Sequence, residues 1–216
     1  DLGYTNVVGI ELNEETVRHV NLAHPELNIV TGNILDMPYE ECSFDAVLSF
    51  GVVEHFPEGL DGPMRAILKV LRHGGMAVIT VPCLNKIRWL IDRVQLEILI
   101  PRNWKQMRKG RNAGGRSANG YLYTVFPKWG DFYEYRLTKK EFEEACQNAG
   151  FEIVESIPIA HIDGLYHIFG RIFVKYDRYH FNVSRLGNLI NKTMIRCPFL
   201  HNHMHACVLR KPALVR

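Results

Sequence analysis

The chain has 216 residues, of which 47% are hydrophobic and 23% charged, and its formal net charge is +3. This composition excludes a disordered or fibrous protein and predicts one soluble α/β domain over 1–216, while the small net charge gives no indication of a nucleic-acid partner. The five cysteines are scattered, without a CxxC pair, and no apolar run reaches the roughly 20 residues that cross a bilayer. We therefore expect a cytoplasmic protein.

Strand and helix patterns alternate through the first half of the chain. The apolar run at 44–49 is continuous, which is typical of a strand covered on both faces. Asn13 predicts the start of one helix, and Gly74 with Gly75 predicts the end of another. The pattern favours a mostly parallel sheet with helices on both faces. Strands are predicted over 7–11, 28–31, 44–49 and 76–81, and helices between Asn13 and Pro25 and over 59–72.

Basic residues gather in the middle of the chain. Between positions 84 and 117 there are nine Lys or Arg residues against two acidic ones. Apolar residues recur at helical spacing over 84–98, which predicts an amphipathic basic helix. The glycine-rich stretch 101–130 is interpreted as a loop or lid. We therefore expect a basic insert over 84–130 within the domain.

Regular structure is expected to resume after the insert. Thr138 and Glu141 have the spacing of a helix capping box, and Gly150 marks the end of that helix. Strands are predicted over 151–154 and 206–209. These elements extend the α/β pattern to the end of the chain.

Several segments together resemble a known family. Glu11 follows the first strand, the segment 32–38 follows the second, and the segments 44–55 and 70–75 contain a buried strand and a Gly-Gly turn. This order resembles the class I S-adenosylmethionine-dependent methyltransferases of the small-molecule type. Residues 132–151 are similar to members from bacterial surface-polysaccharide gene clusters. The resemblance implies a Rossmann-like α/β fold with S-adenosylmethionine as cofactor, and the basic helical insert then follows the fifth strand.

The chain departs from this family at its beginning. The family's first strand and Gly-x-Gly turn do not occur before Asp1. Gly110, Gly114 and Gly115 follow a basic helix rather than a strand, so they do not replace that turn. We therefore expect an N-terminally truncated methyltransferase whose own activity is open.

The expected cofactor residues lie at the carboxyl ends of the strands, where open α/β sheets bind ligands. A carboxylate at this position accepts hydrogen bonds from two ribose hydroxyls, although nicotinamide enzymes use the same device. The resemblance implies contacts to the adenine from the residues after the next strand, and contacts to the methionine part from a tight corner after a third. A plain turn-forming role remains open for the asparagine. The predicted cofactor-binding residues are Glu11, Asn33, Ile34, Ser49, Phe50 and Gly51.

His55 is the candidate catalytic base, because an imidazole with a pKa near neutrality accepts a proton from a hydroxyl group. A structural role beside Glu54 is the alternative. Tyr133, Tyr135 and Arg136 follow the insert and are predicted to line the acceptor site. The expected reaction is methyl transfer to a small molecule or a glycan or lipid-linked acceptor, at oxygen.

Other interpretations compete with this one. The basic segment 84–111, with Trp89 and Trp104, is also suited to docking on an anionic membrane surface, against the alternative of a solvated lid. A noncatalytic methyltransferase remnant and an NAD-dependent oxidoreductase are the remaining alternatives. The run 201–205 holds three histidines, but core packing explains them, so no metal site is predicted.

Overall fold

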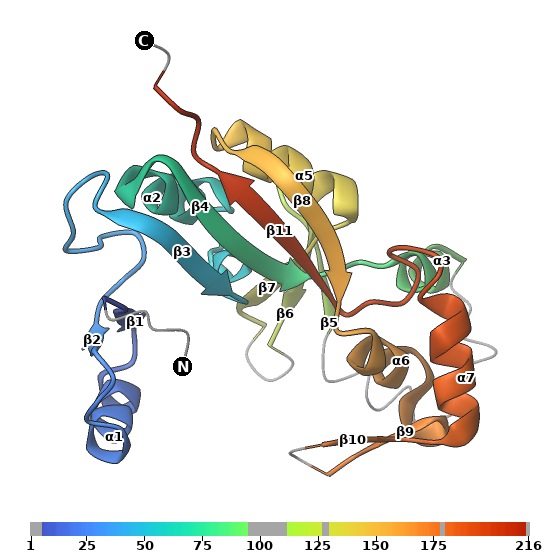
Figure 1. The fold of residues 1–216 in the computed structure, drawn as a ribbon. Coiled ribbons are helices and arrows are strands. Elements are labelled where there is room, and N and C mark those ends of the chain that lie inside the picture. Colours follow the sequence, from blue (N-terminus) through green and yellow to red (C-terminus); the bar gives the residue numbers. More distant parts are fainter. Residues whose placement is uncertain (1–5, 95–111, 127–129, 178–179, 215–216) are drawn as a thin grey trace.

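The computed structural model describes residues 6–94, 112–126, 130–177 and 180–214. Its central sheet has four strands in the order β3-β4-β11-β8 (Figure 1). β3 and β4 are parallel, whereas β11 runs antiparallel to both of its neighbours. The strands are β3 (Phe44–Phe50), β4 (Leu71–Pro82), β8 (Glu152–Ile159) and β11 (Met204–Arg210). This arrangement has the predicted α/β character.

A second, two-stranded parallel sheet precedes the central one. It pairs β1 (Gly9–Glu11) with β2 (Ile29–Thr31), and α1 (Glu14–Ala23) connects them. The Asn13 side chain accepts a hydrogen bond from the Thr16 amide, which confirms the predicted helix start. Within the described ranges β1 pairs only with β2 and β3 only with β4, so the parallel strands form two separate pairs.

Helices α2 (Asp61–Val70) and α5 (Lys139–Asn148) pack on one face of the central sheet (Figure 1). The core lies between them and includes fully buried Met64, Ile79 and Phe142. On the opposite face Leu48 is 65% exposed and Phe50 is 61% exposed. Helices were predicted on both faces of the sheet. Among the described residues they pack on one face of the central sheet.

The boundary between α2 and β4 corrects the sequence interpretation of Gly74 and Gly75. α2 already ends at Val70, and both glycines lie inside β4, beside a register shift opposite β3. Gly74 has φ +78° and its amide donates to the Lys211 carbonyl. The same Gly-Gly signal that ends a helix also marks a strand irregularity, which is its role here.

The interpretation of 101–130 as a loop is wrong for its described second half. β5 (Asn112–Arg116), β6 (Leu122–Val125) and β7 (Phe132–Arg136) form a three-stranded antiparallel sheet. Glycine-rich sequences seldom form strands, but Gly114 lies against the Tyr123 ring, where a Cβ would come within 2.2 Å of a ring carbon. The predicted basic helix is present as α3 (Lys86–Val94), and the segment 95–111 lies outside the described residues.

Further elements that the sequence interpretation did not include lie between β8 and β11. They are α6 (His161–Phe169), the short helix η2 (Gly170–Ile172), the hairpin of β9 (Val174–Tyr176) and β10 (Phe181–Val183), and α7 (Arg185–Met194). Figure 1 shows them grouped beside α3 at the end of the central sheet. Among the described residues, no helix is long and apolar enough to cross a membrane.

Candidate functional site

Glu11 is the last residue of β1, at the carboxyl end of the first parallel pair. One of its carboxylate oxygens accepts a hydrogen bond from the Asn13 amide at 2.8 Å. This bond orients the side chain at the entrance to α1. Because a carboxylate can accept about four hydrogen bonds, the Glu11 side chain can still accept hydrogen bonds from a ligand.

Asn33 and Ile34 follow the neighbouring strand β2. The Asn33 Oδ1 atom accepts a hydrogen bond from the Leu35 amide at 2.9 Å, so the side chain forms a local turn. The turn-forming alternative is therefore the observed geometry, and the amide nitrogen is left to donate. Ile34 is half-buried against the main core, which connects the end of β2 to that core.

Ser49, Phe50 and Gly51 form the carboxyl end of β3. The Ser49 side chain is buried, and within the described residues its hydroxyl has no hydrogen-bond partner. Gly51 has φ +68°, a conformation that favours glycine, and its amide donates to the Thr80 carbonyl. The backbone thus turns sharply at the strand end and leaves a buried hydroxyl beside the turn.

The short helix η1 (Val53–His55) carries Glu54 and His55 immediately after this turn. Glu54 is 1% exposed, and burial, helped by the nearby Glu134 charge, raises its pKa to about 8. The His55 Nδ1 atom lies 2.7 Å from the Tyr133 carbonyl oxygen, and its Nε2 atom lies 3.8 Å from Glu54. Since Glu54 is mainly protonated at pH 7, the two side chains do not form an ion pair there.

The three predicted acceptor residues on β7 have different environments. Tyr133 packs edge-on against the His55 ring, with ring centroids 5.3 Å apart. Tyr135 is buried and its hydroxyl donates to the Pro57 carbonyl at 2.7 Å. Arg136 is also buried, and its Nε atom lies 3.4 Å from a Glu134 carboxylate oxygen. The structure therefore brings Tyr133 to His55 and gives Arg136 a partner within its own strand.

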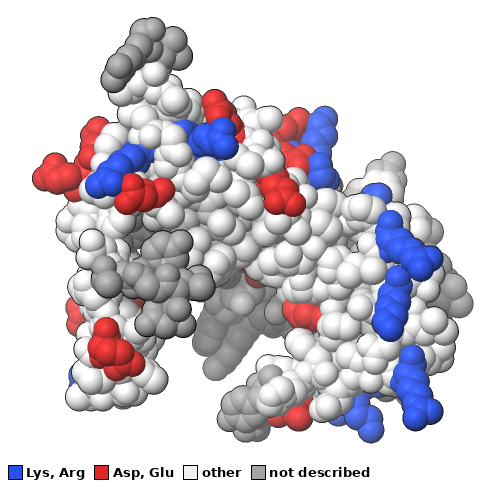
Figure 2. Space-filling view, viewed as in Figure 1, with Lys and Arg blue, Asp and Glu red and all other residues white. Residues whose placement is uncertain are grey.

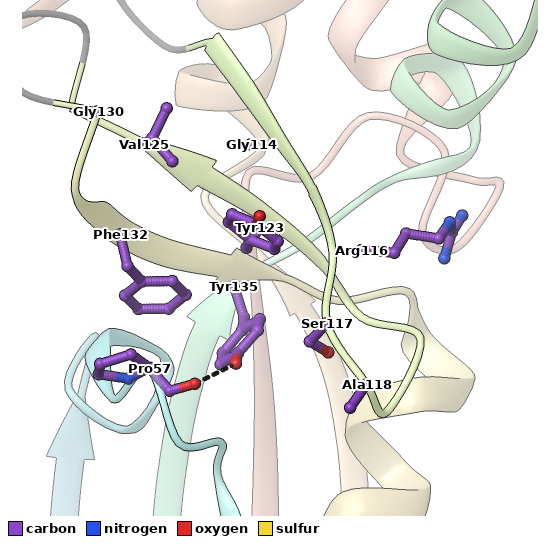
Figure 3. Close-up of a pocket in the computed structure, with 10 residues that line it drawn as sticks. All are labelled: Pro57, Gly114, Arg116, Ser117, Ala118, Tyr123, Val125, Gly130, Phe132 and Tyr135. Atoms are coloured by element: carbon purple, nitrogen blue, oxygen red, sulfur yellow. Dashed lines mark hydrogen bonds between the residues drawn. The ribbon is translucent and has the colours of Figure 1, made fainter.

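An open pocket of about 740 Å³ lies between the β5-β6-β7 sheet and the turn that follows η1. Figure 3 shows the Tyr123, Phe132 and Tyr135 rings in this pocket, with Pro57 at one end and Arg116 directed away from the rings. Burial raises the pKa of the Tyr135 hydroxyl, so this group stays protonated and neutral. The lining suits a small molecule with an apolar face and hydrogen-bonding edges. The residues around it are Pro57, Gly114, Arg116, Ser117, Ala118, Tyr123, Val125, Gly130, Phe132 and Tyr135.

Sequence reasoning predicted Tyr135 but missed most of this pocket. Arg116 and Tyr123 lie in the segment interpreted as a loop, so the strand alternation that brings side chains to one face was not recognised. For Glu54, the sequence predicted only a structural role beside His55. Its burial follows from packing between η1 and β7, which no local pattern reveals.

Comparisons with known proteins agree with this architecture. Residues 1–79 match the methyltransferase domain family. A curated relative from Mycolicibacterium smegmatis, named as an S-adenosylmethionine-dependent methyltransferase, is 26% identical over 159 residues, which are 74% of this chain and 48% of the relative. An uncharacterised protein of Methanocaldococcus jannaschii is 27% identical over 156 residues, which are 69% of this chain and 55% of that protein. The chain spans about half the length of these relatives.

Solved structures show the same fold. A Haloferax volcanii protein described as a methyltransferase, solved in complex with a methyltransferase activator, has a TM-score of 0.56 and 16% identity, covering 99% of this chain and 75% of its own. An S-adenosylmethionine-dependent methyltransferase from Methanosarcina mazei has a TM-score of 0.54 and 15% identity, covering 96% and 82%. The chain is thus similar to S-adenosylmethionine-dependent methyltransferases in its first 79 residues, and its Rossmann-like fold is the one that these solved structures share.

Proposed function

We propose that this chain binds S-adenosylmethionine at the carboxyl ends of β1, β2 and β3 and transfers its methyl group to a small-molecule acceptor. The observation that carries the proposal is the placement of Glu11 and of the Ser49 to Gly51 corner at the ends of parallel strands. Ligands bind at these ends in open α/β sheets. The match of residues 1–79 to the methyltransferase domain family supports the same cofactor.

The groups present fit this cofactor in three respects. The Glu11 carboxylate, which accepts one hydrogen bond from the Asn13 amide, can accept further hydrogen bonds from the two hydroxyls of a ribose. Ser49 offers a buried hydroxyl that lacks a partner among the described residues. Gly51, with its positive φ, removes the side chain where a ligand approaches the backbone. Asn33 fits less well as an acceptor for the adenine amino group, because its Oδ1 already accepts the Leu35 amide.

The bound cofactor supplies an electrophilic methyl group on a sulfonium, so the protein contributes mainly by positioning and by handling one proton. A carbonyl oxygen only accepts hydrogen bonds, so the Tyr133 carbonyl requires a hydrogen on His55 Nδ1. Neutral His55 then has its lone pair on Nε2, which accepts a proton from a bound hydroxyl. The Tyr123, Phe132 and Tyr135 rings position the acceptor and displace water from one side.

The acceptor that this arrangement favours is a hydroxyl compound of sugar or lipid-linked type. Aromatic rings pack against the apolar face of a sugar, whereas the Arg116 side chain is directed away from the rings and donates to the Gly120 carbonyl. The His55 side chain is 39% exposed, and its ring packs against Tyr133 of β7, the strand that also carries the pocket residues Phe132 and Tyr135. We therefore include methyl transfer to a hydroxyl oxygen of the acceptor in the proposal.

Calorimetric titration tests the cofactor assignment. S-adenosylmethionine, S-adenosylhomocysteine and NAD are titrated into this chain. We expect 1:1 binding of the first two, lost on Glu11→Ala and kept in Glu14→Ala, which removes a neighbouring exposed carboxylate. Binding of NAD in their place supports an oxidoreductase. Binding of neither cofactor overturns the proposal and leaves a noncatalytic remnant.

Docking on an anionic membrane surface is a second candidate property. Trp89 and Leu90 of α3 are 41% and 50% exposed, and Leu186 and Leu189 of α7 are also exposed. Figure 2 shows Lys and Arg side chains down the side where Figure 1 places α3 and α7. Basic and apolar side chains together favour an anionic bilayer surface. Sedimentation with anionic and neutral liposomes at low salt tests this, and equal recovery with both contradicts it.

A further inference from the structure

Two side chains of α6 and one from the segment before β11 converge on one point. Asp163 and His167 are four residues apart on α6, so both lie on one helix face. His203 comes from the segment that leads into β11. None of these residues belongs to the strand-end site or to the aromatic pocket.

The three side chains are close enough to share a ligand. Asp163 Oδ1 lies 3.3 Å from His167 Nε2, and Asp163 Oδ2 lies 3.6 Å from His203 Nε2. The two imidazole rings stack with centroids 4.3 Å apart and planes at 16°. One ligand atom from each residue lies within 4.8 Å of the other two. Each side chain is between 13% and 25% exposed, so water reaches the cluster.

The backbone around the cluster holds His203 against α6. At Gly164, the residue after Asp163, a Cβ would come within 1.7 Å of the His201 carbonyl oxygen, so only glycine allows this approach. The His203 amide donates to the Ala160 carbonyl, and Ala160 has φ +56°, a conformation rare for a side-chain-bearing residue. The Asn85 side chain donates to the Asn202 carbonyl. Contacts on both sides therefore fix the position of the third side chain.

We propose that Asp163, His167 and His203 bind a divalent zinc-type cation. One ligand atom from each of two imidazoles and a carboxylate, all within 4.8 Å of one another, forms a set of the kind that binds zinc. A tetrahedral zinc with bonds of about 2.0–2.1 Å separates its ligand atoms by about 3.3 Å. The distances of 3.3 and 3.6 Å found here run to different oxygens of Asp163, and the two rings are nearly parallel, so binding requires the imidazoles to rotate until one metal lies in the plane of both rings. Two nitrogens and one oxygen favour zinc, cobalt or iron over calcium and magnesium.

Three protein ligands leave one position for water. Structural zinc sites have four protein ligands, whereas open sites have three, so this cluster has the ligand number of an exchangeable or reactive site. The histidine triplet 201–205 therefore does not act as a unit. His201 pairs with Asn191 and packs against the His161 ring of α6, and His205 pairs with Ser156, while His203 lies beside Asp163.

Cobalt titration of the tag-free chain tests the site, because tetrahedral cobalt absorbs visible light. We expect 1:1 binding with visible bands, displacement by zinc, and a zinc-dependent rise in Tm. His203→Gln lowers cobalt affinity by about 10- to 100-fold or more. His180→Gln is the matched control, since His180 also lies near an aspartate, Asp177, but is 82% exposed.

Variant folding is checked by circular dichroism before titration. Where His203→Gln lowers stability, His167→Gln on the helix face gives the same test without changing the segment before β11. Absence of stoichiometric binding overturns the proposal, as does equal affinity in His203→Gln and His180→Gln. Cofactor titration of the same variants is independent, so failure of the metal site and failure of the proposed function are distinguishable.

Discussion

The Nδ1 atom of His55 lies 2.7 Å from the carbonyl oxygen of Tyr133 and joins two segments that are 78 residues apart in the chain. One segment is the turn after β3, at the proposed cofactor end, and the other is β7, at the aromatic pocket. This hydrogen bond connects the two halves of the proposed site. It also selects the imidazole tautomer whose Nε2 accepts a proton.

Replacement of His55 by Asn separates proton transfer from positioning. The Asn side-chain nitrogen still donates a hydrogen bond to the Tyr133 carbonyl, but the amide accepts no proton at neutral pH. We expect turnover of a hydroxylated acceptor, chosen from a panel of sugars, to fall by about 10²- to 10⁴-fold. S-adenosylhomocysteine affinity, measured by calorimetry, should change little. Wild-type turnover in His55→Asn contradicts the base assignment and supports a positioning role.

Glu54 predicts a distinct dependence of stability on pH. Burial raises its pKa to about 8 from 4.5 in the unfolded chain, so the folded state binds its proton more tightly. The stabilisation is therefore complete below pH 4.5 and is lost as pH rises through about 8. Titration of Glu54 should therefore lower the free energy of unfolding by up to about 1.4 kcal/mol per pH unit between pH 4.5 and about 8.

Urea denaturation across pH 5 to 8 measures this effect. Glu54→Gln keeps the shape of the side chain and removes the titration, so its stability should vary less with pH than that of the wild type. Glu58→Gln, at an exposed position of the next turn, should keep the wild-type slope. Identical slopes in Glu54→Gln and wild type would show that Glu54 is ionised in the folded protein.

Gly51 and Gly62 predict opposite responses to the same substitution. Gly51 has φ +68°, so Gly51→Ala should lower the free energy of unfolding by about 1 kcal/mol. Gly62 lies in the first turn of α2, where alanine favours the helix and a Cβ would sit 3.4 Å from Leu35. Gly62→Ala should therefore be neutral or stabilising by up to about 1 kcal/mol. Chemical denaturation of both variants is the measurement, and a shared sign contradicts this account of Gly51.

Local signals in the sequence predicted some elements well. The Thr138 hydroxyl accepts the Glu141 amide and the Glu141 carboxylate accepts the Thr138 amide, so the predicted capping box is confirmed. Both groups lie within one turn, and their geometry depends on four residues only. The strand end predicted at Glu11 agrees with β1, and the end predicted at Ser49 lies one residue before the end of β3.

Longer-range relationships were beyond such signals. Gly74 with Gly75 and Gly114 with Gly115 have the composition of turns, but all four lie inside strands, beside the register shifts of β4 against β3 and of β5 against β6. The partners of His201, His203 and His205 depend on α7, α6 and β8, which meet only in the folded chain. The contact of His55 with Tyr133 likewise depends on how β7 packs against η1. Sequence therefore predicted candidate residues better than their partners.

The bond between Tyr135 and Pro57 makes the pocket sensitive to a single hydroxyl. The Tyr135 hydroxyl donates to the Pro57 carbonyl at 2.7 Å and fixes the turn after η1 to β7. Tyr135→Phe keeps the ring but removes this bond, so the free energy of unfolding should fall by about 1 kcal/mol. Hydrogen exchange should become faster at the Gly59 amide, which donates to Phe56 within that turn. Tyr123→Phe, on the other side of the pocket, should leave exchange at Gly59 unchanged (Figure 3). If Tyr135→Phe also leaves it unchanged, packing of the ring rather than the hydroxyl holds the turn, and the pocket keeps its shape without the bond.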